Sequence, residues 1–157
     1  MQVVPVIKHC QKSPGFLQLS CKLEFSCNDF DSNRLIKSIA DLANQWPSLE
    51  KTTSIEITCD DNLNEEAYLL VVTEHGIKIC SKTDVGAFYA VMTLKQLVNK
   101  EGMVACCEIK DEPDLKIRGF MMDIRRAKVP TLDTIKQVID LLASLKYNHL
   151  ELYVEGF

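Results

Sequence analysis

The sequence lacks the features that would place it at a membrane or around a cofactor. No apolar run in its 157 residues reaches the roughly 18 residues that a membrane-spanning helix needs. Its N-terminus shows no charged leader followed by a long apolar stretch, so no signal peptide is visible. The three histidines are scattered, and none has ligand spacing to a cysteine. We therefore expect no membrane partner, no metal and no cofactor.

Positive charge is scarce as well. The chain has 18 Lys and Arg residues against 22 Asp and Glu residues, which gives a net charge of −4 and argues against a nucleic-acid partner. The seven cysteines are odd in number and contain no C-x-x-C motif, so free thiols of a reducing compartment are favoured over a disulfide framework. These observations predict a cytoplasmic protein.

The hydrophobic fraction of 46% is sufficient for a packed core. The apolar residues of the first 60 positions follow the spacing of strands and of one helix. Alternating apolar residues predict half-buried strands over residues 17–26 and 54–59. Apolar residues at helical spacing predict a helix over 33–46, with Asp31 or Ser32 as its N-cap.

A hairpin and a second helix follow. The predicted elements are strands 67–73 and 76–80, a helix that begins at Thr83 or Asp84, and a strand over 103–109. We assign the turn of the hairpin to Gly76, because hairpin turns favour glycine. The wide apolar face of the helix predicts deep burial. This order of elements predicts an α+β sheet covered by helices.

A polar linker that contains Pro113 separates this region from a different pattern, so we predict domains over 1–112 and 113–157. Beyond the linker, a strand from Arg118 to Asp123, a helix over 131–146 and a strand over 147–155 form one strand–helix–strand unit with parallel pairing. The chain stops with nothing further to pair with the last strand. We expect a fragment, and self-association as a homodimer through the unfinished unit.

Candidate ligand-binding residues lie where these two strands end. Asp123 and Arg126 follow the first strand, and Glu155 ends the second. Parallel sheets and barrels place ligand-binding groups at this end. Carboxylates and guanidiniums there would bind a polyhydroxylated ligand. The alternative is an Asp123–arginine ion pair that only orders a loop. No residue is assigned a catalytic role.

Five segments in this order resemble a known family. They are Glu66–Thr73 (EAYLLVVT), Gly76–Ile79 (GIKI), Gly86–Leu97 (GAFYAVMTLKQL), Arg118–Asp123 (RGFMMD) and Tyr147–Leu152 (YNHLEL). Together they resemble the non-catalytic N-terminal domain of glycoside hydrolase family 20, the β-N-acetylhexosaminidases, followed by the start of its catalytic (β/α)8 barrel.

The resemblance implies a zincin-like domain over 1–112, with two helices on one side of a sheet, and a truncated barrel over 113–157. The full-length enzyme would remove terminal β-linked N-acetylhexosamine by substrate-assisted retaining hydrolysis. The family's catalytic Asp–Glu pair lies on a later barrel strand, so we expect this chain alone to be inactive. The resemblance also assigns Arg118 to the sugar hydroxyls.

The chain departs from the common family pattern at two places. Arg125 stands where a small residue is usual, and Tyr153-Val154-Glu155 replaces a His-x-His stretch. These departures suggest a divergent subgroup. Two alternatives remain open: a relative of family 84, the O-linked N-acetylglucosaminidases, and a non-enzymatic interaction module that uses an exposed sheet edge.

Overall fold

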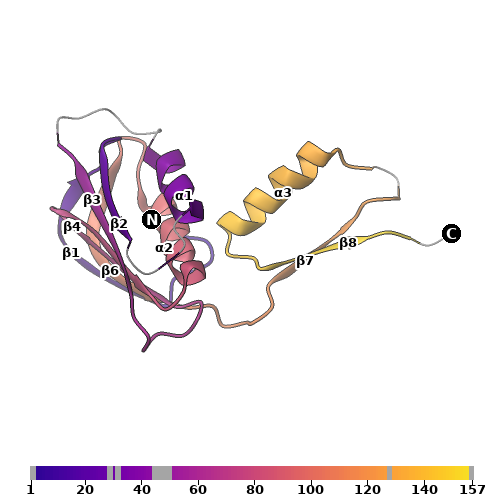
Figure 1. Cartoon of the computed structure of the whole chain (residues 1–157), viewed down its shortest axis with the longest axis horizontal. Coiled ribbons are helices and arrows are strands. Elements are labelled where there is room, and N and C mark those ends of the chain that lie inside the picture. The colour runs from indigo at the N-terminus through magenta and orange to yellow at the C-terminus, as the bar shows by residue number, and fades with distance from the viewer. Residues whose placement is uncertain (1–2, 28–29, 31–32, 44–50, 127–128, 156–157) are drawn as a thin grey trace. The chain divides into compact units, whose positions relative to one another are not determined.

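The computed structural model describes residues 3–27, 30, 33–43, 51–126 and 129–155. The chain divides into two compact units, Met1–Pro113 and Asp114–Phe157 (Figure 1). Among the described residues, no helix is long and apolar enough to span a membrane.

The first unit is one mixed sheet with two helices. The strands lie in the order β1-β6-β4-β5-β3-β2. Their bounds are β1 (His9–Gln18), β2 (Leu23–Cys27), β3 (Thr53–Cys59), β4 (Tyr68–Thr73), β5 (Gly76–Ser81) and β6 (Met103–Asp111), and the helices are α1 (Asn33–Ala43) and α2 (Asp84–Leu97). The α+β sheet with two helices that the sequence predicts is confirmed.

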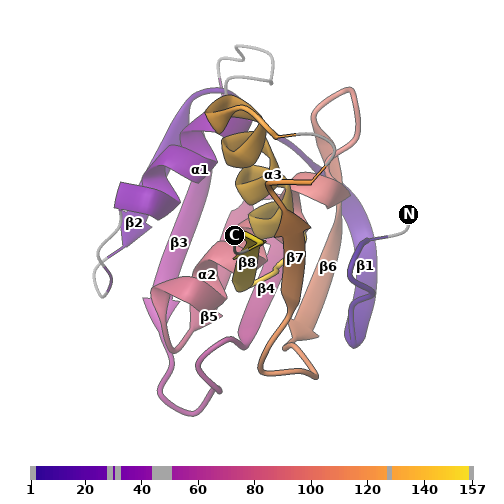
Figure 2. The ribbon, with the colours of Figure 1, turned by 90° about the vertical axis from the view of Figure 1, so that its right-hand side faces the viewer.

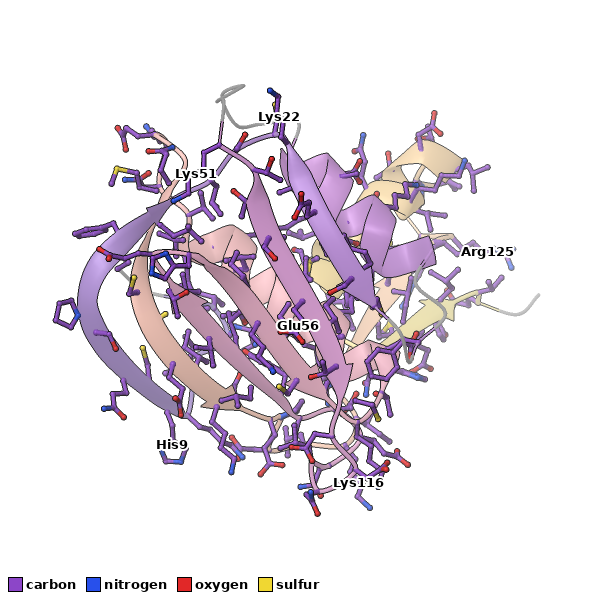
Figure 3. The ribbon with its side chains drawn as sticks, turned by 60° about the vertical axis from the view of Figure 1, so that its left-hand side comes forward. His9, Lys22, Lys51, Glu56, Lys116 and Arg125 are labelled. Carbon is purple, nitrogen blue, oxygen red and sulfur yellow. The ribbon has the colours of Figure 1, made fainter. Side chains whose placement is uncertain are left out.

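Both helices cover the same face of this sheet (Figure 1). The fully buried side chains come from α1, α2 and the strand residues that face them, and they include Leu35, Ile55, Ile79, Leu94 and Ile109. The opposite face carries polar side chains such as Glu56, which lies 3.6 Å from Lys78 on the neighbouring strand (Figure 3). β3 has one apolar and one polar face, so alternation identifies it correctly, whereas β4 carries Leu69 and Val71 on the face opposite its buried residues.

The predicted hairpin is present, but the role assigned to Gly76 is wrong. Glu74 and His75 form the turn, and Gly76 is the first residue of β5 and has no positive φ. A Cβ built on Gly76 would lie 2.9 Å from the carbonyl oxygen of Ser54 on β3. Glycine is therefore needed for the close approach of the neighbouring strand and not for the turn.

The single strand predicted over residues 17–26 is also wrong, because the chain crosses the sheet within it. β1 and β2 lie on opposite edges of the sheet (Figure 2). Between them, the Leu19 amide donates to the Gly102 carbonyl at 2.9 Å, and the Ser20 amide donates to Thr53 Oγ1 at 3.0 Å. These contacts replace strand pairing while the alternation of apolar residues continues.

The first half of β1 has no counterpart in the prediction. Its pairing with β6 is regular from His9 to Lys12 and resumes at Phe16, with an irregularity between them. Pro14 and Gly15 fall in this irregularity, and Gly15 has a φ of +100°. An extra segment in one strand breaks the alternation that predicts strands from sequence.

The first predicted helix is present as α1, and the second as α2 with Thr83 as its N-cap. The Thr83 side chain accepts a hydrogen bond from the Gly86 amide at 3.3 Å, which resolves the choice between Thr83 and Asp84. The candidate caps Asp31 and Ser32 and the predicted helix end at residues 44–47 lie outside the described residues.

A polar cluster is buried within the first unit. The Tyr68 hydroxyl lies 2.6 Å from Thr93 Oγ1 on α2 and donates to Asp111 Oδ2 at 2.9 Å. The other oxygen of Asp111 accepts from the Lys8 amide at 3.1 Å. Burial is the main cause that raises the pKa of Tyr68, and the negative charge of Asp111 adds to it. The cluster therefore joins β4, α2, the end of β6 and the residue before β1.

The second unit contains β7 (Gly119–Asp123), α3 (Leu132–Ser144) and β8 (His149–Tyr153). β7 and β8 pair in parallel, as predicted, with Gly119 opposite His149 and Asp123 opposite Tyr153. Thr131 caps the start of α3. Lys146, with a φ of 62°, ends it: the Lys146 amide donates to the Ala143 carbonyl and the Tyr147 amide donates to the Leu142 carbonyl.

Candidate functional site

The candidate site lies at the carboxyl ends of β7 and β8, within the second unit. Asp123 is the last residue of β7, and its Oδ1 accepts hydrogen bonds from the amides of Arg125 and Arg126, each at 3.0 Å. Its Oδ2 accepts from Arg126 Nε at 2.7 Å. These donors, the Arg125 amide first, lower the pKa of Asp123 from its ordinary 3.8 to about 2. The carboxylate therefore stays charged at neutral pH.

Arg126 also reaches the neighbouring strand. Its Nε lies 3.4 Å from Glu155 Oε2, and its guanidinium carbon lies 5.2 Å from the centre of the Tyr153 ring. The guanidinium of Arg125, which is labelled in Figure 3, donates to the Glu155 carbonyl oxygen. The structure thus brings Asp123, Arg126 and Glu155 together, and the two arginines link the turn after β7 to the end of β8.

Arg118 is placed apart from this cluster. It immediately precedes β7, whereas Asp123 ends that strand. Its Nε donates to the Lys146 carbonyl at 2.7 Å, and its Nη1 donates to the Leu115 carbonyl at 2.6 Å. Its backbone amide donates to Asn148 Oδ1 at 2.9 Å. In this structure Arg118 contacts the backbone at the amino ends of the two strands, and the other three residues lie at the carboxyl ends.

Tyr153 is a member of the cluster that sequence reasoning missed. The signal that would reveal it is strand register: Tyr153 pairs with Asp123, so their side chains share one face of the parallel pair. An aromatic ring in that position provides a surface for the guanidinium of Arg126.

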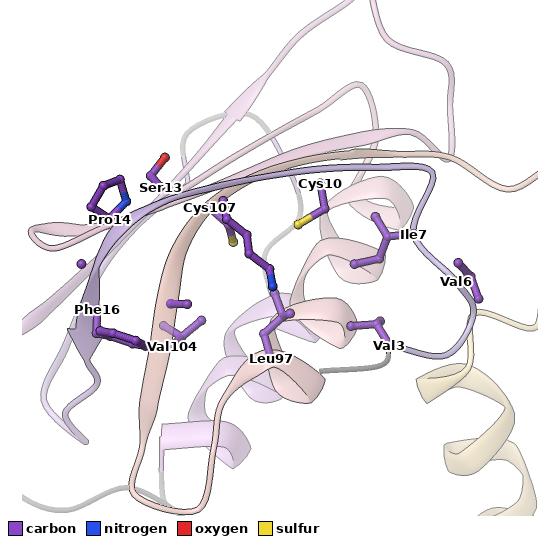
Figure 4. A pocket seen from close by; sticks show the side chains of 13 residues that line it. Val3, Val6, Ile7, Cys10, Ser13, Pro14, Phe16, Leu97, Val104 and Cys107 are labelled. Carbon is purple, nitrogen blue, oxygen red and sulfur yellow. The ribbon is translucent and has the colours of Figure 1, made fainter.

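A cavity of about 830 Å³ lies in the first unit, beneath the curved N-terminal half of β1 (Figure 4). Apolar side chains such as Ile7, Leu97 and Val104 line it, together with the thiols of Cys10 and Cys107. Its lining includes no carboxylate, and Lys12 and Ser13 are its polar side chains besides the thiols. Among the described residues, no three His, Cys, Asp or Glu side chains are grouped so that they could hold a metal ion.

Comparison with known proteins decides the family. The family model for glycosyl hydrolase family 20, domain 2, matches residues 1–112. The chain belongs to glycosyl hydrolase family 20. The match covers the whole six-stranded sheet and both of its helices.

Curated relatives and solved structures extend the similarity into the second unit. The chain is 30% identical over 155 residues to the β-hexosaminidase of Vibrio furnissii, a match that covers 94% of this chain and 25% of that protein. The family 20 exo-β-N-acetylglucosaminidase of Vibrio harveyi, solved with N-acetylglucosamine, has a TM-score of 0.79 and 25% identity over 97% of this chain and 25% of its own.

A structure at lower identity shows the same fold. The family 20 β-N-acetylhexosaminidase of Streptomyces coelicolor A3(2) has a TM-score of 0.85 and 23% identity, and the match covers 98% of this chain and 35% of that chain. The chain therefore spans a quarter to about a third of the length of these relatives. The comparisons favour family 20 over both alternatives, the family 84 relative and the interaction module.

Proposed function

We propose that this chain is a segment of a β-N-acetylhexosaminidase that removes terminal β-linked N-acetylhexosamine with retention of configuration. The observation that supports the proposal is an alignment that runs beyond the family 20 domain and through the second unit to a β-hexosaminidase. The substrate would be a carbohydrate, and its own 2-acetamido group would act as the nucleophile, as the family resemblance implies. The 157-residue chain alone would be inactive.

In this proposal the first unit is the zincin-like, non-catalytic domain. The β7–α3–β8 unit is the first strand–helix–strand of a (β/α)8 barrel, with the domain boundary near residue 112. Its parallel pairing and the polar cluster at the carboxyl ends of its strands support this assignment, because barrel enzymes bind their substrates at that end. The resemblance assigns Arg118 to sugar hydroxyls, but Arg118 lies at the amino ends of the strands, and its guanidinium would have to leave the Lys146 and Leu115 carbonyls to reach a substrate.

The unfinished barrel unit and the cysteines support two smaller proposals. Apolar side chains of the second unit such as Leu132, Leu141 and Val154 are exposed, so the isolated chain would form a homodimer through this unit. All seven cysteines are free, which supports a reducing compartment such as the cytoplasm.

The experiment that tests the activity uses the complete gene product that contains these residues. We expect it to hydrolyse 4-nitrophenyl N-acetyl-β-glucosaminide, and proton NMR of the first-formed sugar to show the β-anomer. The 157-residue chain, purified in the same way, is the control and should release no nitrophenol. A complete protein of the relatives' length that hydrolyses neither the glucosaminide nor the galactosaminide would contradict the proposal.

A further inference from the structure

The cavity beneath the N-terminal half of β1 has the size of a ligand-binding site. Its volume of about 830 Å³ falls within the range of about 300–1,000 Å³ that is usual for small-molecule sites. Figure 4 shows the thiols of Cys10 on β1 and Cys107 on β6 pointing into it, with Leu97 on the other side. The pairing of β1 is irregular between Lys12 and Phe16, and α2 ends at Leu97, so the end of the helix leaves a space under the curved strand.

The segment before β1 forms one wall of this cavity and is held at both ends. The Val4 amide donates to Gln96 Oε1 at 2.8 Å, and Gln96 Nε2 donates to the Val4 carbonyl at 2.8 Å. At the other end, the Lys8 amide donates to Asp111 Oδ1 at 3.1 Å. Between these contacts Ile7 lines the cavity. The wall is therefore fixed both to α2 and to the end of β6.

One charged side chain faces the cavity. Lys12 lies opposite Cys107 in the pairing of β1 with β6, and it shares a face of β1 with Cys10, because alternate residues of a strand point the same way. Burial is the main cause that raises the pKa of Cys107, and the Lys12 ammonium opposes it, which places that charge near the buried thiol. Lys12 is itself exposed, as expected of a charge at the opening of an apolar cavity.

This ammonium is available to a ligand. Within the described part of the chain, no carboxylate forms an ion pair with Lys12, and none lines the cavity. No second cation is found in the described lining, so the cavity suits a head group with one negative charge better than a phosphate dianion.

The rest of the lining suits an alkyl chain. Its apolar side chains include Val3, Ile7, Leu97 and Val104. A chain placed against them is removed from water, which is the main source of affinity at such surfaces. A ligand with an alkyl chain and one carboxylate meets the requirements of both parts of the cavity.

We propose that this cavity binds an amphipathic carboxylate of the fatty-acid class, with its alkyl chain against Leu97 and Val104 and its carboxylate at Lys12. The site is formed by residues of the first unit alone, and the inference does not depend on the proposed hexosaminidase activity. It gives a binding role to the domain that the family resemblance describes as non-catalytic.

The test measures the binding of decanoate to the complete gene product by isothermal titration calorimetry, below the concentration at which decanoate forms micelles. Decyltrimethylammonium has the same chain and the opposite charge, and should bind about 10-fold more weakly, because the ammonium attracts one head group and repels the other. Lys12→Met should weaken decanoate binding by about 5-fold, the effect of losing an ion pair at a partly exposed site. Lys110→Met, an exposed change on the opposite face of β6, is the matched control and should leave the affinity unchanged.

Thiol labelling locates the bound chain. Decanoate should slow the alkylation of Cys10 by iodoacetamide and should not affect Cys59, which is exposed and lies outside the cavity lining. Cys10→Trp, which places an indole in the cavity, should abolish the heat of binding, and its thermal unfolding midpoint establishes that it is folded. The protection of Cys10 needs no variant, so it tests the site even if Cys10→Trp does not fold.

Four outcomes would overturn the inference. The first is that wild type does not bind decanoate or binds it no better than Lys12→Met does. The second is binding that leaves Cys10 unprotected, because the ligand would then lie elsewhere. The third is binding to the 157-residue chain but not to the complete gene product, because another part of that protein would then fill the cavity. The fourth is protection of Cys10 that rises with protein concentration without ligand, which would identify a second copy of the chain as the occupant.

Discussion

Gly86 at the start of α2 lies directly against the backbone of Ala67, the residue before β4. A Cβ built on Gly86 would fall 2.4 Å from the Ala67 carbonyl oxygen and 3.1 Å from the Ser81 side chain. The helix lies this close to the sheet only because position 86 has no side chain.

Substitution Gly86→Ala should therefore destabilise the first unit. Because the obstructing atom is a backbone oxygen, α2 must shift, and we expect a loss of about 1–3 kcal/mol in the free energy of unfolding. Urea denaturation followed by far-UV circular dichroism measures it. Lys37→Ala, on the exposed side of α1, is the control and should change the free energy of unfolding little. A Gly86→Ala variant as stable as the wild type would contradict this prediction and show that α2 can shift at little cost.

Tyr68→Phe should destabilise the same unit by about 1–2 kcal/mol, because it removes the hydroxyl that bonds Thr93 and Asp111 in the core. Tyr89→Phe is the matched control. The Tyr89 hydroxyl bonds Glu66 Oε1 at 3.1 Å in a less buried place, so its loss should have the smaller effect. Equal unfolding midpoints for the two variants would contradict this account of the polar cluster.

Asp123 should titrate far below an ordinary aspartate. Its pKa is lowered to about 2, so its ionised form is the one that folding favours. The stabilisation by its hydrogen bonds is then present above the pKa of about 4 of the unfolded chain, and is lost as pH falls through about 2. A carbon-13 NMR titration of the carboxyl groups checks this, and Arg126→Met should move the midpoint upward. A titration midpoint near 4 for Asp123 in the wild type would show that its hydrogen-bond donors do not stabilise the ionised carboxylate.

The thiols should differ in reactivity. Cys107 is buried in the sheet, and burial is the main cause that raises its pKa to about 11, whereas Cys10 and Cys59 are exposed. Iodoacetamide at pH 8 should alkylate Cys10 and Cys59 in the folded chain, and Cys107 only after denaturation. Peptide mass spectrometry identifies the labelled sites. Labelling of Cys107 at the rate of Cys10 would contradict this account and show that the reagent reaches the thiol in the folded chain, through an opening of β6 or through the cavity that Cys107 lines.

The isolated chain should self-associate through its second unit. The side chain of Ile139 on α3 is 46% exposed and that of Met121 on β7 is 57% exposed, and both would be covered by a second copy. Size-exclusion chromatography with light scattering, over a dilution series, should show a dimer. Ile139→Lys should shift the population to monomer, and Lys136→Gln on the same helix should not. A wild-type chain that is monomeric at every concentration would contradict the proposal.

Elements with one buried face were predictable from the sequence. β3 follows its alternation at Ile55 and Ile57, which are buried, although Cys59 at its end is exposed. α2 is buried along most of its length, as its wide apolar face predicts. The second unit was predictable as strand–helix–strand from the spacing of its apolar residues alone, since no residue of α3 is buried, and its helix ends at Ser144, before the predicted residue 146.

The failures concern contacts between distant parts of the chain. Leu19 and Cys21 continue the alternation of a strand, but the chain there passes to the opposite edge of the sheet, and no local pattern encodes that passage. Gly76 looked like a turn residue because glycine in hairpins usually is one; the real constraint is the backbone of β3, which is distant in sequence.

The candidate site shows the same limit. Position at a strand end was sufficient to group Asp123, Arg126 and Glu155, because parallel strands place their carboxyl ends together. Tyr153 depended on the register of the two strands, which has to be set before Tyr153 is seen to lie opposite Asp123. The hydrogen bonds of Arg118 depended on the positions of the Leu115 and Lys146 carbonyls, which no local pattern encodes.

The pairing of β1 with β6 has a consequence for how the domain is made. His9 lies opposite Lys110, so about a hundred residues must leave the ribosome after the first strand before its partner exists. Until then the edge of β4 that β6 will occupy is open, and β1 has no strand to bind. Pairing over such a sequence distance is slow to form, because a long loop must close first. The N-terminal strand of this domain therefore cannot join the sheet before β6 has been synthesised.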